Sequence, residues 1–517
     1  MEAERRKLPI GIQTFREIRE EGYYYADKTD HIRRLARDGK HYFLSRPRRF
    51  GKSLLLDTIK ALFEGSEALF RGLAIHGGWD WRQRHPVVRL SFGRGSFTKP
   101  DEVGASAAEQ IDAIAGEQGF LLTASTVAGR FAALLDALHK GSGQRVAVLV
   151  DEYDKPILDA LGQPEVARAN RDFLRGLYSV IKDCDAHVRF TLLAGVSKFS
   201  KVNLFSGLNN LIDITLEPEF ATICGYTEAD LDTVFAPEMA GLDRGEVREW
   251  YNGYNWRGTE RVYNPYDVLL LCRRREFGAW WFETGTPTFL VDMLTRRGVN
   301  AFELDGMKAN ESLLSSFDVE EIAVEALLFQ TGYLTVEQSA FKGGRRRYRL
   351  GYPNREVRQS LNDVLLLRLA GGRENRALAA GRLYDRFLAD DLAAVETELR
   401  ALFAGIPSDW HRRNDIARFE GCYASVFYAA LAAAGMDLTV EEASSAGRLD
   451  LAMHFDGRVY LFEFKVAERA SEGAALRQLS ERGYADKYRH LGEPIRLVGV
   501  EFSEATRNIS GFEVAEA

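Results

Sequence analysis

Short apolar runs alternate with longer amphipathic stretches over the first 200 residues. The apolar runs lie at 41–44, 85–92, 146–150 and 187–195. Compact runs of this kind predict buried strands. The amphipathic stretches, which predict helices, lie at about 53–63, 103–117, 126–139 and 166–183. This alternation predicts an α/β fold with a doubly wound sheet, which binds its ligand at the carboxyl ends of the strands.

The middle of the chain has a mostly helical pattern. Helices are expected near 228–240, 245–252, 265–275, 288–298, 311–330, 358–369 and 376–403. The intervening turns are rich in aromatic residues and glycine, and the simplest interpretation is packing within a lid-like helical region. They are YNGYNW at 251–256, WWFETGTPTFL at 280–290 and FQTGYLTV at 329–336. The basic stretch at 342–357 predicts a connector or a hairpin facing nucleic acid, and a solvated basic loop is an equally good interpretation.

The last hundred residues predict a second, smaller α/β unit. We expect a helix from Phe419 to Ala434, a strand at Asp437–Glu441, a hairpin, a helix at about 472–490 and a final strand at Ile495–Phe502. The dipeptide Asp456-Gly457 predicts a two-residue hairpin turn. Phe455 then pairs with Arg458. Counting outward places Asp450 directly opposite Glu463.

The paired carboxylates of this hairpin indicate a metal site. Asp450 and Glu463 would repel one another unless a cation lay between them, and carboxylate oxygens suit Mg²⁺ or Mn²⁺. Alternation places Lys465 on the same face as Glu463. Glu420, on the preceding helix, is a further candidate ligand. Gln478, on the following helix, is a candidate contact for phosphate or water.

This set of residues is typical of metal-assisted phosphodiester hydrolysis, with Lys465 near the attacking water. A solvent-facing strand with a cross-strand charge pattern is the alternative interpretation. It leaves the opposed acids Asp450 and Glu463 without a benefit.

A second candidate site follows the first strand. Gly51-Lys52-Ser53 opens a helix after a tight basic turn, which is typical of the second half of a phosphate-binding P-loop. Lys52 would neutralise phosphate oxygens and Ser53 would bind Mg²⁺. The usual first glycine is replaced by Arg46. The residues that we expect to contact nucleotide in this turn are Arg48, Arg49, Phe50, Gly51, Lys52, Ser53 and Leu54.

Polar residues at two later strand ends support the nucleotide site. Asp151 and Glu152 end a continuous apolar run, which is typical of a central parallel strand. Asp151 would reach the Mg²⁺ of the nucleotide, and Glu152 would orient the attacking water. Ser197 follows the next strand, and we expect it to sense the γ-phosphate.

Composition and charge narrow the partners and the compartment. The chain has 517 residues, a formal net charge of −7 and four cysteines that form no metal or disulfide pattern. No stretch is apolar and long enough to predict a signal peptide or a membrane span. We therefore expect a cytoplasmic protein without a membrane partner. Any contact with nucleic acid must be local, because the overall charge is negative.

Long motifs in the sequence resemble a known pairing in bacterial and archaeal proteins. In the pairing, an AAA-ATPase-like P-loop domain precedes a nuclease-like domain of the PD-(D/E)XK superfamily. The motifs are LPIGIQTF, YYYADKT, FLSRPRRFGKSLL, VLVDEYDKP, GVSKFSKVNLFSGLNNL, WYNGYNW, ETGTPTFL, QTGYLTV, GYPNREVR, GRLDL and FEFKV. Arg46 departs from the general P-loop but agrees with RPRRFGKS as this family has it, which implies an altered phosphate cradle.

The resemblance implies a P-loop NTPase sheet with a helical lid, followed by a restriction-endonuclease-like α/β domain. The expected segments are an ATPase-like domain at 1–225, a helical lid at 226–345, a helical connector at 346–410 and a nuclease-like domain at 411–517. The resemblance implies ATP and Mg²⁺ or Mn²⁺ as the cofactors of the protein. Its partner would be nucleic acid, with DNA favoured over RNA, and a homo-oligomer is left open.

Three hypotheses remain at this point. In the first, nucleotide binding or hydrolysis controls a metal-dependent nuclease. In the second, the protein is a nucleotide-regulated switch or scaffold that binds nucleic acid without cutting it. In the third, the nuclease uses ATP only as a structural ligand. Residues 411–517 carry 13 Lys and Arg against 17 Asp and Glu, so basic residues elsewhere, such as Arg345–Arg347, would have to assist in binding.

Overall fold

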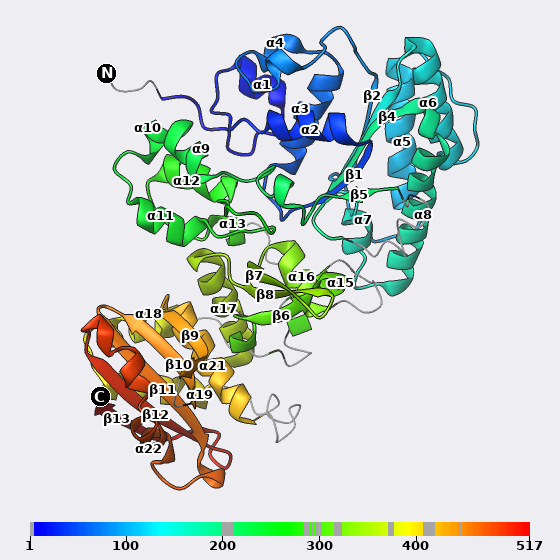
Figure 1. Cartoon of the computed structure of the whole chain (residues 1–517). Coiled ribbons are helices and arrows are strands. Elements are labelled where there is room, and N and C mark those ends of the chain that lie inside the picture. Colours follow the sequence, from blue (N-terminus) through cyan, green and yellow to red (C-terminus); the bar gives the residue numbers. More distant parts are fainter. Residues whose placement is uncertain are drawn as a thin grey trace. The chain divides into compact units, whose positions relative to one another are not determined.

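Two compact units make up the chain in the computed structural model (Figure 1). The first comprises Met1–Trp281 and Lys308–Asn354, and the second comprises Phe282–Met307 and Arg355–Ala517. The structure describes residues 5–198, 208, 210–283, 290, 293–294, 299, 301–314, 323–370, 377–406, 419–444 and 447–517.

A five-stranded parallel sheet forms the centre of the first unit. Its order is β2-β3-β4-β1-β5. The strands are β1 (His41–Ser45), β2 (Val87–Ser91), β3 (Val146–Asp151), β4 (Val188–Gly195) and β5 (Ile212–Asp213). Every side chain of β1 and β3 is buried, as expected for strands covered on both faces. The mixed α/β class and the strands predicted for this unit are confirmed.

Helices cover both faces of this sheet. The long ones are α2 (Thr29–Asp38), α3 (Lys52–Phe63), α5 (Glu102–Glu117), α6 (Val127–Ser142) and α8 (Pro164–Asp183), and the short ones are α1 (Phe15–Glu20), α4 (Glu67–Phe70) and α7 (Lys155–Leu158). Figure 1 shows α2 and α3 on one side of the sheet and α5, α6 and α8 on the other. The ends of β1, β3 and β4 are in register, with Ser45 beside Gly195 and Asp151 beside Ala194. The sheet therefore brings the predicted polar residues to one edge.

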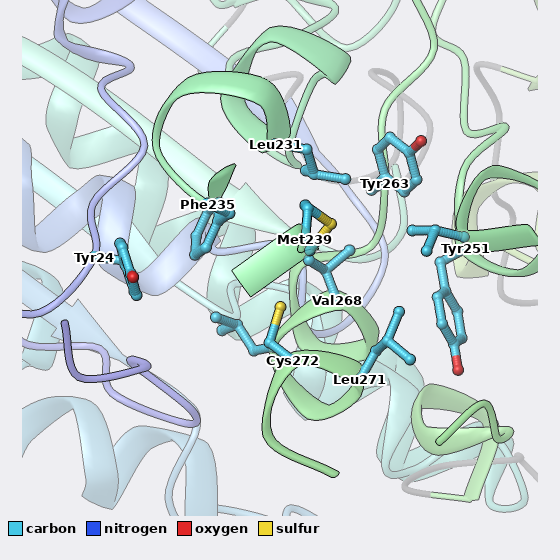
Figure 2. Close-up of a cluster of buried hydrophobic side chains, with 11 residues drawn as sticks. Tyr24, Leu231, Phe235, Met239, Tyr251, Tyr263, Val268, Leu271 and Cys272 are labelled. Carbon is cyan, nitrogen blue, oxygen red and sulfur yellow. The ribbon is translucent and has the colours of Figure 1, made fainter. Parts of the chain in front are cut away.

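A separate apolar cluster holds the helical part of the first unit together (Figure 2). Its helices are α9 (Glu228–Thr233), α10 (Ala236–Met239), α11 (Arg244–Tyr251), α12 (Pro265–Arg274) and α13 (Trp280–Glu283). Tyr24, from the motif YYYADKT, packs into the cluster beside Phe235, with ring centroids 5.2 Å apart. The helix predicted at 228–240 is in fact two helices, because Pro237 lies in the first turn of α10 and begins a new helix.

The helix predicted at 311–330 is also wrong as a single element. It begins as α15 (Glu311–Leu314) and reappears as α16 (Val324–Thr331), while 315–322 lie outside the described residues. The sequence after α16 forms β7 (Thr335–Lys342) and β8 (Arg345–Gly351), which join β6 (Met307–Asn310) in a sheet of order β6-β8-β7. The basic stretch is therefore a hairpin rather than a loop. Most of the helix predicted at 288–298 lies outside the described residues.

A second five-stranded sheet, of order β13-β12-β11-β10-β9, forms the centre of the other unit. Its strands are β9 (Asp437–Ser444), β10 (Gly447–Phe455), β11 (Arg458–Val466), β12 (Ile495–Ser503) and β13 (Asn508–Glu516). Strands β9, β10 and β11 are antiparallel neighbours, and β12 runs parallel to β11. The edge strand β13 was not predicted. The helix predicted at 472–490 is only α22 (Ala474–Glu481), followed by two short 3₁₀ turns.

Helices α21 (Phe419–Ala433) and α22 pack on this second sheet. The Phe427 ring of α21 lies 5.3 Å from Phe462 and 5.0 Å from Phe464, measured between centroids. Leu479 of α22 packs with Val459 and Leu461 of β11. Since side chains alternate along a strand, α21 and α22 cover opposite faces of β11.

The helices of the region predicted as a connector lie in this second unit. They are α17 (Arg355–Ala370), α18 (Ala377–Leu388) and α19 (Leu392–Ala404), of which α17 packs on α21 and α19 on β13. The helix predicted at 376–403 is broken because Asp390 has φ 51° and Asp391 caps α19. The second unit includes everything from Arg355 to Ala517. Within the described residues, no helix combines the length and apolarity needed to cross a membrane.

We expect Gly253→Ala to destabilise the first unit. A Cβ at Gly253 would overlap the carbonyl of Pro353, and the φ of 111° is unfavourable for alanine. The change should lower the free energy of unfolding by about 2–4 kcal/mol. Tryptophan fluorescence during urea unfolding measures this, because every tryptophan except Trp410 lies in the first unit. Gly162→Ala, where a Cβ would meet no atom within 4 Å, is the control. Equal midpoints for the two variants would contradict the packing argument.

Candidate functional site

The turn between β1 and α3 has the backbone of a tight phosphate-binding loop. Gly51 has φ 87° and lies directly before the first helical residue, Lys52. Arg49 has φ 66°, which is unusual for a residue with a side chain. The backbone N–H groups at the start of α3 have no partner within the helix, so they are available to an anion. The loop therefore reaches a glycine-like conformation with arginine in place of one glycine.

The side chain of Arg46 holds the backbone of this loop in place. Its side chain is completely buried and donates hydrogen bonds to the carbonyls of Ser45, Thr215 and Phe220, at 2.8–3.0 Å. Its guanidinium also lies 4.2 Å from the ring centroid of Trp256. Burial lowers the pKa of Arg46 to about 10. Arg46 thus fixes the backbone where the usual loop has glycine.

Aromatic residues from 254–281 hold the rest of the turn. Phe50 packs edge-on against Tyr254 and Trp256, at centroid distances of 4.7 and 5.5 Å. Trp281 donates a hydrogen bond from Nε1 to the carbonyl of Arg48, at 3.0 Å. Tyr254, Trp256 and Trp281 therefore do more than pack the helical region. They fix the conformation of the loop that precedes Lys52.

Lys52 is folded back onto its own loop. Its ammonium donates to the carbonyls of Arg46 and Pro47, both at 2.8 Å, and its side chain is buried. Burial lowers the pKa of Lys52, and the neighbouring Asp151 and Asp154 carboxylates oppose this shift. A phosphate group would be a stronger, charged acceptor for the same ammonium.

Asp151 is buried and has one carboxylate oxygen, Oδ1, without a hydrogen-bond partner among the described residues. Its other oxygen, Oδ2, lies 3.4 Å from Nη2 of Arg89 on β2. Arg89 also donates to Asp57 of α3, at 2.7 Å, and lies 3.4 Å from the carbonyl of Ser53. A buried orphan oxygen beside the start of α3 fits a Mg²⁺ that accompanies a nucleotide. The sequence prediction missed Arg89, whose signal is a charge in the middle of the apolar run VVRLS.

Glu152 follows β3 in a strained conformation. Its φ is 50°, and its side chain is half-buried. Burial and then the adjacent Asp151 raise the pKa of Glu152, while Lys52 lowers it. Strained residues that persist in a fold are concentrated at functional sites. The geometry is compatible with the predicted role of Glu152 in orienting the attacking water.

Ser197, which we expected to sense the γ-phosphate, is hydrogen-bonded to Asp154, a residue to which the sequence prediction gave no role. Its hydroxyl donates to Oδ2 of Asp154 at 2.6 Å, and the backbone N–H groups of Val196 and Ser197 donate to the same oxygen. Both side chains are buried. A Cβ at Gly195 would overlap Asp154, which explains the glycine at the end of β4. Any contact of Ser197 with a phosphate would first have to break this bond.

The hairpin of the second unit has the predicted register. Phe455 pairs with Arg458, and the pairing continues to Leu451 with Phe462. The next residues outward are Asp450 and Glu463. Asp450 accepts a hydrogen bond from the backbone N–H of Phe464 at 2.9 Å. The Asp456-Gly457 turn therefore sets a register in which each acid follows the last pair of the hairpin.

Glu463 is the centre of this second group. Its side chain is buried, and its Oε1 accepts hydrogen bonds from Lys465 Nζ, at 2.8 Å, and from Gln478 of α22. Lys465 also donates to the carbonyl of Phe464, at 3.1 Å. The structure thus brings together Asp450, Glu463, Lys465 and Gln478. Glu420 belongs to α21, but its side chain lies outside the described residues.

The chemistry of these ligands suits a hard divalent cation. Asp450 and Glu463 offer carboxylate oxygens, which Mg²⁺ and Mn²⁺ prefer. In the described ranges, no three His, Cys, Asp or Glu side chains lie close enough to hold a metal by themselves. Two protein carboxylates with water and phosphate oxygens are nevertheless a common Mg²⁺ environment.

Comparisons with known proteins find two domain families in the chain. The family model described as "Predicted AAA-ATPase" matches residues 9–205, and that of the PD-(D/E)XK nuclease superfamily matches residues 418–512. The "Uncharacterized protein in vnfD 5'region" of Azotobacter chroococcum mcd 1 is 56% identical over 511 residues, which cover 99% of each chain. The chain belongs to this family. It joins an AAA-ATPase-like domain to a PD-(D/E)XK nuclease superfamily domain, and no solved structure matches it.

We expect that lysine cannot replace Arg46 without a loss of stability. Arg46→Lys keeps the charge but loses the planar donors that reach three carbonyls, and each charged hydrogen bond contributes about 1.5–3 kcal/mol. The free energy of unfolding should fall by about 3 kcal/mol or more, measured by tryptophan fluorescence in urea. Arg49→Lys, at an exposed position of the same turn, should change it by less than about 1 kcal/mol. Equal effects would show that Arg46 does not brace the loop.

Proposed function

We propose that this protein is an ATP-dependent nuclease in which the nucleotide state gates the cleavage of phosphodiester bonds in DNA or RNA, with DNA favoured. The group formed by Asp450, Glu463, Lys465 and Gln478 is the observation that carries the proposal. The family supplies the coarser statement, that the chain has ATPase-like and nuclease-superfamily domains. We also propose a cytoplasmic location, which suits the free cysteines Cys184, Cys224 and Cys272.

In the nuclease domain, Asp450 and Glu463 would hold a Mg²⁺ or Mn²⁺ ion. When bound, such an ion polarises the phosphodiester and makes water a better nucleophile. Gln478 fixes the orientation of Glu463 through its hydrogen bond to Oε1. Lys465 carries a half-buried ammonium beside the acids, where it can orient the attacking water and stabilise the charge that develops on the phosphate.

In the ATPase-like domain, the backbone from Arg48 to Leu54 would bind the phosphates of ATP. Lys52 would leave the carbonyls of Arg46 and Pro47 and move to the phosphate oxygens. Ser53 and the orphan oxygen of Asp151 would hold the nucleotide's Mg²⁺. Glu152 would orient the water that attacks the γ-phosphate. ATP supplies the binding and hydrolysis energy that gates the nuclease.

The β7–β8 hairpin is the proposed contact for the nucleic-acid backbone. Lys342 pairs with Arg345, and Ala340 pairs with Arg347, so three exposed cations lie on one face of this two-stranded ribbon. None of the three forms an ion pair with another described residue, whereas Arg349 is paired with Glu337. Phe341, which pairs with Arg346 on the opposite face of the ribbon, is 68% exposed and offers a surface on which a base can stack. This basic surface would offset the acidic balance of residues 411–517.

Asp450→Asn should lower cleavage by at least about a hundredfold in Mg²⁺ or Mn²⁺. The matched control is Asp456→Asn, at the turn of the same hairpin, where asparagine tolerates the positive φ of 49°. The assay follows labelled DNA and RNA with and without ATP. In the same assay, Glu152→Gln should retain ATP but stop its turnover, and cleavage should then lose its response to hydrolysis.

The alternatives give different outcomes in this assay. No cleavage by the wild-type protein in any nucleotide state would contradict the nuclease and favour a switch or scaffold. Cleavage that requires ATP but is unchanged in Glu152→Gln would show that ATP is only a structural ligand. Equal activity of Asp450→Asn and Asp456→Asn would contradict the assignment of the metal site.

Replacing the three hairpin cations should weaken nucleic-acid binding. The variant Lys342→Ala/Arg345→Ala/Arg347→Ala, made in the Asp450→Asn background to prevent cutting, should bind duplex DNA at least about tenfold more weakly. The slope of log K against log salt should fall by up to about 2.7, because each lost phosphate contact removes about 0.9. A triple change at the exposed residues Arg16, Arg82 and Lys140 is the control, measured by fluorescence anisotropy. An unchanged salt slope in the hairpin variant would contradict this contact.

A further inference from the structure

Glu501 is a buried acid beside the proposed nuclease site. It lies on β12, directly across from Lys465 on β11, while Gly499 lies across from Glu463. Paired residues on neighbouring strands point to the same face of a sheet, and the strands are about 4.8 Å apart. Glu501 therefore shares the α22 face with Glu463 and Lys465. The prediction from sequence placed Glu501 in the final strand but gave it no role.

The carboxylate of Glu501 has no hydrogen-bond donor among the described residues. The residue is 7% exposed, and its Oε1 is buried without a partner. A Cβ at Gly511 of β13 would come within 3.2 Å of Oε2, so glycine leaves the room that the carboxylate occupies. A buried carboxylate oxygen without a donor is unfavourable. We therefore expect the protein to have a state in which a donor reaches the Glu501 carboxylate.

Lys465 is the donor that the geometry provides. In the present state its ammonium shares Oε1 of Glu463 with Gln478. A divalent cation held by Glu463 would repel this ammonium, because two positive groups would then compete for one carboxylate. The side chain on the other side of Lys465, across the strand pair, is Glu501. A flexible lysine stem can exchange between neighbouring acceptors with little change in the backbone.

We infer that Glu501 is the second acceptor of Lys465, which receives the ammonium when a divalent cation occupies Asp450 and Glu463. This inference rests on the proposed metal site of the nuclease. It makes Glu501 a positioning residue. Without Glu501, Lys465 would remain at Glu463 and oppose metal binding. With Glu501, Lys465 stays ordered beside the reacting phosphate after the metal has entered.

Mn²⁺ titration of the full chain by isothermal calorimetry tests the inference without measuring activity. Glu501→Gln keeps the shape and removes the charge, and it should weaken Mn²⁺ binding at least about fivefold. In a Lys465→Met background the same change should alter Mn²⁺ affinity less than about twofold, because the ammonium that needs Glu501 is gone. Glu513→Gln, an exposed acid on the same face of β13, is the control for a general charge effect and should leave affinity unchanged.

A loss of affinity that is equal in the wild-type and Lys465→Met backgrounds would overturn the inference and leave Glu501 as a long-range charge. If Glu501→Gln fails to fold, a structure of the wild-type protein with Mn²⁺ decides the matter. Lys465 Nζ should then lie within hydrogen-bond distance of Glu501, and a lysine still bonded to Glu463 would overturn the exchange. A wild-type protein that binds Mn²⁺ at Asp450 but cuts no nucleic acid would contradict the proposed function alone. A protein that binds no Mn²⁺ would overturn both.

Discussion

A carboxylate removed from water must be matched by donors or by a cation, and this requirement shapes both ends of the chain. In the first unit, Arg89 accompanies Asp151, and the hydroxyl and backbone groups at Ser197 satisfy Asp154. In the second unit, Lys465 and Gln478 both donate to Oε1 of Glu463. An unmatched buried carboxylate costs several kcal/mol, so these partners are conditions for the fold as well as parts of the sites.

The same requirement explains how ligands would act. A phosphate at Lys52 would replace the backbone carbonyls of Arg46 and Pro47, and a cation at Asp151 would meet the oxygen that has no partner among the described residues. The loop that precedes Lys52 is held by Arg46 and by aromatic rings instead of several glycines. These rings come from the helical part of the first unit. A change in the loop on nucleotide binding would therefore be felt by those helices, which offers a physical start for gating.

Local chemistry made much of the fold and of both sites predictable from the sequence. Continuous apolar runs gave the parallel strands, and the Asp456-Gly457 turn alone gave the register that aligns Asp450 with Glu463. Both signals depend on a few neighbouring residues. The break in the helix at Asp390 was not predicted, because a non-glycine residue adopts a positive φ there.

The roles of Arg89, Asp154 and Glu501 depend on contacts with distant strands, which no local pattern reveals. Arg89 resembles an interruption of a strand until β2 pairs with β3 beside Asp151. Asp154 meets Ser197 only because β3 and β4 are adjacent. The proposed role of Glu501 depends on its position across from Lys465 on the next strand. The sequence also offered no strong signal for β13, in which only Ile509 is buried.

We propose that the chain holds two separate acidic sites, one that binds a divalent cation with nucleotide and one that binds it without nucleotide. Equilibrium dialysis with Mn²⁺, with and without a non-hydrolysable ATP analogue, distinguishes the two sites. We predict Mn²⁺ binding without nucleotide that Asp450→Asn abolishes and Asp151→Asn preserves. We also predict additional binding with the analogue that Asp151→Asn abolishes and Asp450→Asn preserves. If both substitutions removed the same Mn²⁺, or if neither affected Mn²⁺ binding, the chain would not have two separate cation sites at Asp151 and Asp450.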